Sequence, residues 1–261
     1  MSLIFEEVGD AIYRRRYEFL DQNIGVILGG DGVLVVDTRS VPSHAEEIAA
    51  ELRAFTPLPV SWVVNTHWHW DHVLGNSIFA GAEIWGHTRC QEVMRDDPEY
   101  VRAGASRGLG EGLAAEVATA EIVPPGRTFD RNIDLDIGGR VVHLAYRGLG
   151  HTDADLTLAV DDVLFAGDLL EEGAPPAFGD SYPLRWPDTV ESHVAEKPRL
   201  IVPGHGDVMT AGDAAGQVEE LYEVSRRCRA AATEAELDLV GAPYPDDVMK
   251  LAFNRARAER G

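Results

Sequence analysis

Short apolar runs separated by glycine-rich turns characterise the first part of the chain. Residues 23–28 and 33–36 are apolar and flank residues 29–32, Gly-Gly-Asp-Gly, a composition typical of a tight hairpin. A helix is expected to start at Ser43, where a capping-box spacing precedes apolar residues at helical intervals. Residues 59–64 have the apolar composition of a buried strand. The pattern therefore predicts two antiparallel strands and a helix that leads to a third strand.

Strands and helices alternate in the segment that follows. We expect a helix at 73–79, a strand at 82–85 and a helix at 88–95. Residues 96–127 are rich in Gly, Ala and Glu and lose this periodicity, with a short helix expected at 112–119. This stretch is interpreted as a lid insertion over the core.

The second half again has the pattern of antiparallel hairpins. Its predicted strands cover residues 131–137, 140–146, 155–160, 163–166 and 200–202. Beyond Thr210 the chain becomes helical, with a last helix at 246–257. No linker composition separates the halves. We expect a single domain over residues 1–261, with a core at about 23–210 and C-terminal helices at 211–261.

Composition limits the classes of function. Apolar residues make up 45% of the chain, yet no apolar run reaches the roughly 20 residues that a membrane span needs. Arg14, Arg15 and Arg16 are not followed by an apolar signal core, so a soluble cytoplasmic protein without a membrane partner is expected. A net charge of −21 disfavours a nucleic-acid partner. Cys90 and Cys228 are far apart and predict neither a disulfide framework nor a thiolate metal site.

The strongest chemical signal is the cluster His67-Trp68-His69-Trp70-Asp71-His72, directly after the strand predicted at 59–64. In a tight loop, His67 and His69 can bind one metal ion. Asp71 and His72 are displaced enough to reach a second ion at the roughly 3.5–4 Å separation of two-metal hydrolytic sites. The spacing predicts a metal site.

Three further glycine-rich turns each follow a predicted strand and carry a residue that can bind metal. These residues are His151, Asp168 and His205, in the turns Gly148-Leu149-Gly150-His151-Thr152, Gly167-Asp168 and Gly204-His205-Gly206. Glycine lets the backbone bend while the side chain points away from the end of the sheet. Together with the histidine cluster they form a complete ligand set.

In its order and spacing, this set resembles that of the metallo-β-lactamase superfamily of metal-dependent hydrolases, over roughly residues 23–210. The resemblance implies a four-layer αββα sandwich, here with a C-terminal helical extension, and a site at one edge between the sheets. It implies that the first metal is held by His67, His69 and His151, that the second is held by Asp71, His72 and His205, and that Asp168 bridges them.

The donor set suits two divalent ions. Imidazole favours zinc, and the carboxylates also accept iron or manganese. We expect a metal-dependent hydrolase in which Asp71 and Asp168 help to hold a metal-bridging hydroxide that attacks a small-molecule ester, thioester, lactone or lactam.

Two other functions stay open at this point. The resembled superfamily includes persulfide dioxygenases that use one iron and only part of the ligand set, and a metal-stabilised binding protein without turnover is the third alternative. Metal content would discriminate between the first two, because about two metals per chain favour hydrolysis and one iron with O₂ uptake favours oxygenation.

Several residues have less certain roles at this stage. Core packing is the preferred interpretation of Trp68 and Trp70, and a helix-start role that of His87. Asp37 and Asp155 are equally consistent with orienting a histidine or with an ordinary turn role. Tyr146 and Tyr182 are candidate oxyanion partners, the arginines at 226, 227 and 229 are expected to form a solvated face, and residues 96–127 and 171–187 are the expected pocket walls.

Overall fold

Continuous apolar strands in this chain serve two cores at once. In β4 (Val33–Val36), Val33 and Val35 pack with α1 (Pro42–Phe55) on one side of the sheet. Leu34 and Val36 point the other way, to a core shared with the second sheet. Alternate side chains of a strand point to opposite faces, so a strand buried on both sides has no polar positions.

The computed structural model describes residues 4–109 and 111–260 and contains two sheets. The first has seven strands in chain order, and the second has five in the order β12-β11-β10-β9-β8. Besides β4, the first sheet comprises β1 (Glu6–Gly9), β2 (Ile12–Tyr17), β3 (Gln22–Leu28), β5 (Val60–Val64), β6 (Glu83–His87) and β7 (Arg127–Phe129). The second comprises β8 (Asn132–Asp136), β9 (Val141–Ala145), β10 (Thr157–Val160), β11 (Val163–Gly167) and β12 (Leu200–Pro203).

Pairing is antiparallel from β1 to β4 and parallel from β4 to β7. The second sheet is antiparallel apart from the parallel pair β11 and β12. Both predicted hairpins of the second half, and that between residues 23 and 36, are confirmed.

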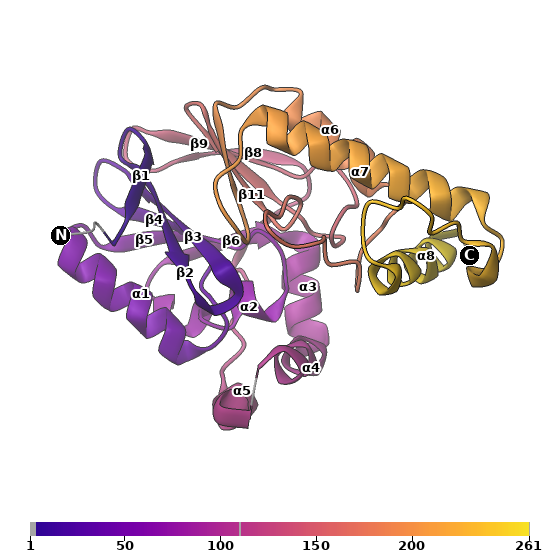
Figure 1. Cartoon of the computed structure of the whole chain (residues 1–261). Helices are drawn as coiled ribbons and strands as arrows, with labels where there is room; N and C mark the ends of the chain where they lie inside the picture. Colours follow the sequence, from indigo (N-terminus) through magenta and orange to yellow (C-terminus); the bar gives the residue numbers. More distant parts are fainter. Residues whose placement is uncertain (1–3, 110, 261) are drawn as a thin grey trace.

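Helices cover the outer faces of both sheets, as Figure 1 shows. Besides α1, the helices are α2 (Trp70–Val73), α3 (Thr88–Asp96), α4 (Pro98–Gly108), α5 (Ala114–Thr119), α6 (Trp186–Val194), α7 (Ala211–Ala230) and α8 (Asp246–Arg260). Short 3₁₀ turns cover Phe19–Asp21, Asn76–Phe79, Glu111–Leu113 and Glu234–Glu236. The order α1, first sheet, second sheet, then α6 and α7 confirms the αββα sandwich.

The C-terminal helices share a core with the second sheet. Leu164 of β11 and Ile201 of β12 belong to the same buried cluster as Trp186 of α6, Leu221 of α7 and Phe253 of α8. That the chain folds cooperatively as one domain stays a prediction, which is based on this shared core.

Two helix boundaries differ from the sequence expectation. The first helix begins at Pro42, whose fixed φ suits a first helical position, and Ser43 donates to Glu116 instead of capping. In place of the helix expected at 73–79, α2 ends at Val73 and a 3₁₀ turn covers Asn76–Phe79. Between them Gly75 lies against the Thr38 carbonyl, where a Cβ would stand 2.0 Å from the oxygen. Trp70 starts the earlier piece, which places Asp71 and His72 in a helical turn.

Backbone hydrogen bonds join the two sheets at one end. The Asn23 amide of β3 donates to the Gly204 carbonyl beyond β12 at 2.8 Å. The Asn23 side chain donates to the carbonyls of Pro203 and Gly206, at 3.0 and 2.9 Å. The start of β3 is thereby fixed to the loop that carries His205.

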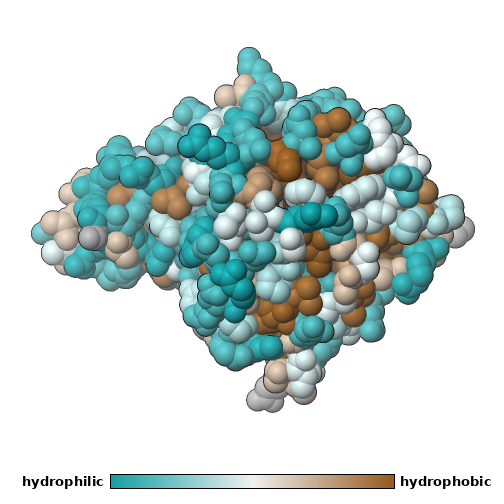
Figure 2. All heavy atoms as spheres, turned by 180° about the vertical axis from the view of Figure 1, so that it is seen from behind, coloured by the Kyte–Doolittle hydropathy of each residue, from teal (hydrophilic) through white to brown (hydrophobic). Residues whose placement is uncertain are grey.

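Much of the surface is hydrophilic. Figure 2 shows a face dominated by hydrophilic residues, with apolar ones in separate patches. Among the described residues, no helix is long and apolar enough to cross a membrane.

Candidate metal centre

The predicted site residues meet where several strands end. His67 and His69 follow β5, and Asp71 and His72 lie in α2 directly after them. Three further turns complete the arrangement: His151 lies between β9 and β10, Asp168 follows β11, and His205 follows β12. The first sheet thus contributes one half of the site and the second sheet the other.

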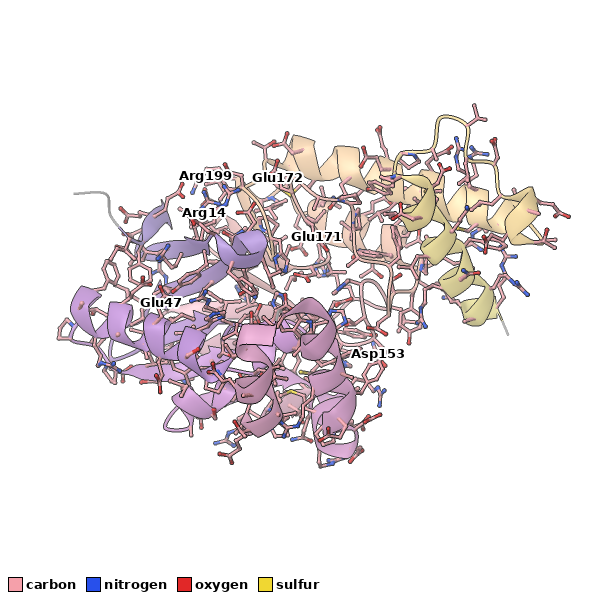
Figure 3. The ribbon with its side chains drawn as sticks, turned by 60° about the horizontal axis from the view of Figure 1, so that its bottom comes forward. Arg14, Glu47, Asp153, Glu171, Glu172 and Arg199 are labelled. Atoms are coloured by element: carbon pink, nitrogen blue, oxygen red, sulfur yellow. The ribbon has the colours of Figure 1, made fainter. Side chains whose placement is uncertain are left out.

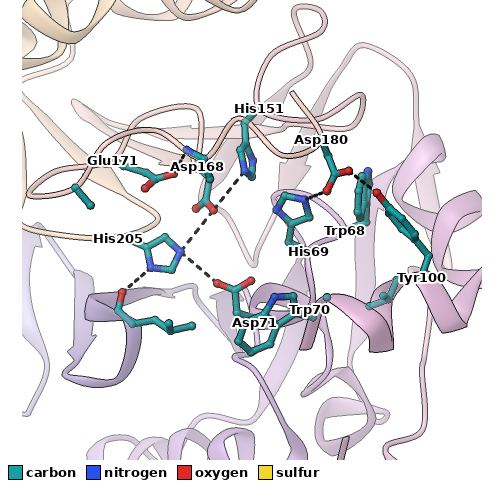
Figure 4. Close-up of a pocket in the computed structure, with 15 residues that line it drawn as sticks. Trp68, His69, Trp70, Asp71, Tyr100, His151, Asp168, Glu171, Asp180 and His205 are labelled. Atoms are coloured by element: carbon teal, nitrogen blue, oxygen red, sulfur yellow. Dashed lines mark hydrogen bonds and ion pairs between the residues drawn. The ribbon is translucent and has the colours of Figure 1, made fainter. Parts of the chain in front are cut away.

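The seven side chains form two groups whose candidate donor atoms lie within 4.8 Å of one another. The first group is His67, His69, His151 and Asp168, and the second group is Asp71, His72 and His205. The structure brings all seven predicted residues together, and Figure 4 shows most of them around one cavity; metal binding by these residues stays a prediction.

Asp168 lies between the two groups. Its Oδ1 is 3.3 Å from His72 Nε2, and its Oδ2 is 3.7 Å from His67 Nε2 and 3.5 Å from His205 Nε2. Asp71 Oδ2 lies 3.3 Å from His205 Nε2. Oδ1 faces the second group and Oδ2 lies near histidines of both groups, so the Asp168 carboxylate lies between them.

Several buried polar atoms at the centre make no hydrogen bond. They are His67 Nε2, His151 Nε2 and Asp168 Oδ1. Buried nitrogen and oxygen atoms without partners are costly, so their convergence indicates that they serve another purpose. Imidazole nitrogen and carboxylate oxygen are donors that Zn²⁺, iron and manganese accept, and the residues therefore fit a pair of divalent cations.

Neighbouring groups fix the outward nitrogens of these rings. Asp37 Oδ2 lies 2.8 Å from His72 Nδ1, and the same carboxylate accepts from the Thr66 amide and hydroxyl. His205 Nδ1 donates to the Leu20 carbonyl at 2.8 Å. Asp155 Oδ1 is 3.6 Å from His151 Nδ1, too far for a good hydrogen bond, and instead accepts from Thr152. Asp37 therefore has the orienting role, while Asp155 mainly holds the turn.

Two of these residues have unusual backbone conformations. Asp37 has φ 65° and Leu20 has φ 60°, in the left-handed region that non-glycine residues seldom occupy. Such strain persists where the surrounding structure holds it, and here each residue supports a site histidine.

The site is strongly coupled electrostatically. Burial alone would raise the pKa of the Asp168 carboxyl, but His72 and His205 outweigh burial and hold this pKa well below its ordinary value. Burial lowers the pKa of His67 far below its usual range, so this ring is neutral and its lone pair is free. Burial would lower the pKa of His72 and of His205 as well, but the Asp168 and Asp71 carboxylates outweigh burial and raise both values in the metal-free protein. Because metals bind neutral imidazoles, metal binding would displace the protons from these two rings.

A pocket of about 390 Å³ opens over both groups. Its described lining includes Trp68, Trp70, Tyr100, Glu171 and Asp180, and none of the described lining residues is Lys or Arg. Residues of 96–127 and of 171–187 line it, as expected for the pocket walls.

Tyr100, Glu171 and Asp180 were not singled out in the sequence. Tyr100 carries no local motif, whereas Asp180 follows Gly179 as Asp168 follows Gly167, a signal that could have been used. Burial, followed by the charge of Asp168, raises the pKa of Glu171 to about 7. Glu171 is labelled in Figure 3.

Other candidates lie elsewhere. Tyr146 stacks on His87 at 4.1 Å between ring centroids, and His87 caps α3 as predicted. Tyr182 lines an adjacent pocket rather than this one. Trp68 is buried in the core yet also reaches the cavity.

The three arginines of α7 have structural partners. Arg226 and Arg227 bind Glu223, and Arg229 donates to the Leu184 carbonyl. Arg226 is exposed as expected, whereas Arg227 is buried, so only part of this cluster forms a solvated face.

Comparison with known proteins agrees with this geometry. The sequence profile of the metallo-beta-lactamase superfamily matches residues 17–205. A linear primary-alkylsulfatase from Pseudomonas sp. (strain ATCC 19151) is 24% identical over 231 residues, covering 75% of this chain and 43% of the alkylsulfatase. The chain thus spans less than half the length of that relative.

Solved structures show the same fold. A metallo-beta-lactamase from Pontibacter korlensis superposes with a TM-score of 0.68 at 17% identity, covering 84% of this chain and 98% of its own. The DIM-1 metallo-beta-lactamase superposes with a TM-score of 0.63 at 15% identity, covering 82% of this chain and 96% of its own.

Proposed function

Because the chain belongs to the metallo-β-lactamase superfamily, we propose that it is a dinuclear metal-dependent hydrolase of a small ester, thioester, lactone or lactam. The observation that carries the proposal is the convergence of two complete donor groups on one cavity, with Asp168 between them. Members of the superfamily are mostly metal-dependent hydrolases. A small-molecule substrate and a cytoplasmic location stay predictions.

The roles of the residues follow from their positions. His67, His69, His151 and Asp168 would hold one ion, and Asp71, His72 and His205 the other. Two divalent ions at such a site supply a lowered pKa for bound water and polarise the bond under attack. Asp37 keeps the His72 ring oriented, and Trp68 and Trp70 exclude water from one wall. Glu171 lines the same pocket, and in the metal-free protein burial and then the charge of Asp168 raise the pKa of its carboxyl to about 7.

Zinc is the proposed metal because five of the seven donors are imidazoles. Metal analysis of the purified protein tests this, together with an assay panel of esters, thioesters, lactones and lactams. About two zinc ions per chain with turnover of one class supports the proposal. One iron per chain with O₂ uptake, or no turnover by fully loaded protein, would overturn it.

Variants test the assignment of residues. Asp168→Ala and His151→Ala should abolish hydrolysis, whereas His143→Ala, which removes an exposed histidine outside the site, should leave it unchanged. Full activity of either site variant with its metal retained would contradict the proposed roles.

Sulfate esters are a second candidate, because the curated relative is an alkylsulfatase. The described pocket lining offers no cation beyond the metals to an anionic substrate, which favours uncharged esters instead. Parallel assays with an alkyl sulfate and its carboxylic ester analogue separate the two.

A further inference from the structure

The metal-site histidine His69 is hydrogen-bonded to a carboxylate from a distant part of the chain. Its Nε2 lies 3.1 Å from Asp180 Oδ2, and Tyr100 donates its hydroxyl to the other oxygen, Oδ1. The chain Tyr100, Asp180, His69 is visible in Figure 4.

The carboxylate decides which ring nitrogen of His69 carries the proton. A neutral imidazole has one N–H, and a carboxylate can only accept, so the proton resides on Nε2. Nδ1 then keeps its lone pair and is the nitrogen left for a metal. The ring is held from the sides as well, since its centroid lies 4.6 Å from Trp68 and 4.5 Å from His151.

Asp180 is itself fixed from several directions. Besides the bonds to His69 and Tyr100, its backbone carbonyl accepts from Arg255 Nη2 of α8 at 3.1 Å. These hydrogen bonds position the Asp180 carboxylate against the His69 ring.

We infer that Asp180 and Tyr100 are positioning residues which hold His69 with Nδ1 towards the metal, so that the wall formed by α4 contributes to metal affinity. The inference rests on the proposed function only in that His69 binds a metal. It assigns a role to the insertion beyond lining the pocket, because Tyr100 links α4 to His69 of the first group through Asp180.

Two measurements test the proposed role of Asp180 and Tyr100. Nitrogen NMR of the metal-free protein should show His69 protonated on Nε2, and Asp180→Ala should remove this preference. In competition with a zinc chelator, Asp180→Ala should weaken one of the two sites by roughly 10- to 100-fold. Tyr100→Phe, which loses the hydrogen bond to Asp180, should weaken the same site by roughly 3- to 10-fold. Asp180→Asn keeps an acceptor oxygen and should restore part of the affinity.

Matched controls lie outside the site. Asp134 accepts from His143 on the exposed surface, and the Tyr222 hydroxyl donates to Asp188 and Glu191 on α6. Asp134→Ala and Tyr222→Phe should leave zinc affinity unchanged. The inference would be overturned if zinc affinity were unchanged in both Tyr100→Phe and Asp180→Asn. It would also be overturned if His69 were protonated on Nδ1 in the unaltered protein. If Asp180→Ala does not fold, these two milder variants still test the inference. Loss of affinity as expected, in a protein that hydrolyses nothing, would reject the proposed function alone.

Discussion

Gly204 lies so close to the Asp168 carboxylate that a Cβ at Gly204 would stand 1.8 Å from Asp168 Oδ1. Gly204→Ala should therefore displace Asp168 and lower kcat/KM by roughly 100-fold, since a misplacement of about 1 Å can cost that much. The metal content of the purified variant should fall as well. In the control Gly216→Ala, nothing lies within 4 Å of the new Cβ in α7, and a gain of about 0.5–1 kcal/mol in stability is expected. Normal activity in Gly204→Ala would show that Asp168 tolerates movement.

Asp37 supports the second group through His72. Asp37→Ala removes the acceptor of three buried donors, on Thr66 and His72, and should weaken metal binding by roughly 10- to 100-fold. Chelator competition measures this. Asp37→Asn keeps an acceptor and tolerates the left-handed backbone, so it should be milder. Equal affinity in Asp37→Ala and the unaltered protein would refute the orienting role.

His193 should make the fold sensitive to acid. Burial, together with the nearby charge of Arg147, lowers the pKa of His193 from 6.5 to about 3. The unfolded chain then binds the additional proton, so this contribution to stability is complete above pH 6.5 and is lost as pH falls towards 3. The loss is about 2 kcal/mol between roughly pH 6.5 and 5. Urea unfolding of the metal-free protein at both pH values measures this change in the free energy of unfolding. In His193→Gln the free energy of unfolding should depend less steeply on pH. An equally steep dependence would mean that other groups cause the effect.

The C-terminal helices should unfold together with the sheets. Phe253 of α8 is fully buried in the cluster that includes Leu164 of β11, so Phe253→Ala should cost about 3–5 kcal/mol. Leu251→Ala on the same helix, 45% exposed, should change stability by less than about 0.5 kcal/mol. Denaturant unfolding followed by two probes should give one transition, and two separate transitions would contradict a single domain.

A positive charge added to the pocket wall should increase the preference for anionic substrates. Ala177 lines the pocket and is exposed, so Ala177→Arg adds a cation beside the reaction site. The ratio of kcat/KM for an anionic ester to that for a neutral analogue should rise up to about fivefold, the usual range for an exposed ion pair. Ala230→Arg, at an exposed position at the end of α7, is the matched control. An unchanged ratio in Ala177→Arg would mean that the substrate does not approach this wall.

The candidate site was more predictable than its surroundings. Glycine-rich turns after strands identified His151, Asp168 and His205 because both the turn and the donor are local in sequence. Tyr100 and Asp180 meet across 80 residues through side-chain contacts that no local pattern encodes. Asp37 was proposed because it ends an apolar strand, but its bond to His72 depends on the packing of β4 beside β5.

The fold was less evident at its N-terminus. β1 and β2 were not predicted, because Arg14, Arg15 and Arg16 obscure the alternation of β2. Ion pairs explain how these arginines are accommodated: Arg14 is buried against Glu6 and Asp207, and Arg15 binds Glu51. Partners that neutralise charges in a strand come from elsewhere in the chain, so composition alone does not reveal them.

The hydrogen bonds from Asn23 to the loop of His205 restrict how the cavity can open. Asp71 and His72 belong to the half of the molecule that contains β3, whereas His205 lies beyond β12 in the other half. An ion bound by the second group would therefore connect the two halves. Separation of the sheets would break both the bonds to this ion and the hydrogen bonds of Asn23. A substrate of the proposed hydrolase would then reach the site through the pocket bordered by α4 and by residues 171–187, without separation of the two sheets.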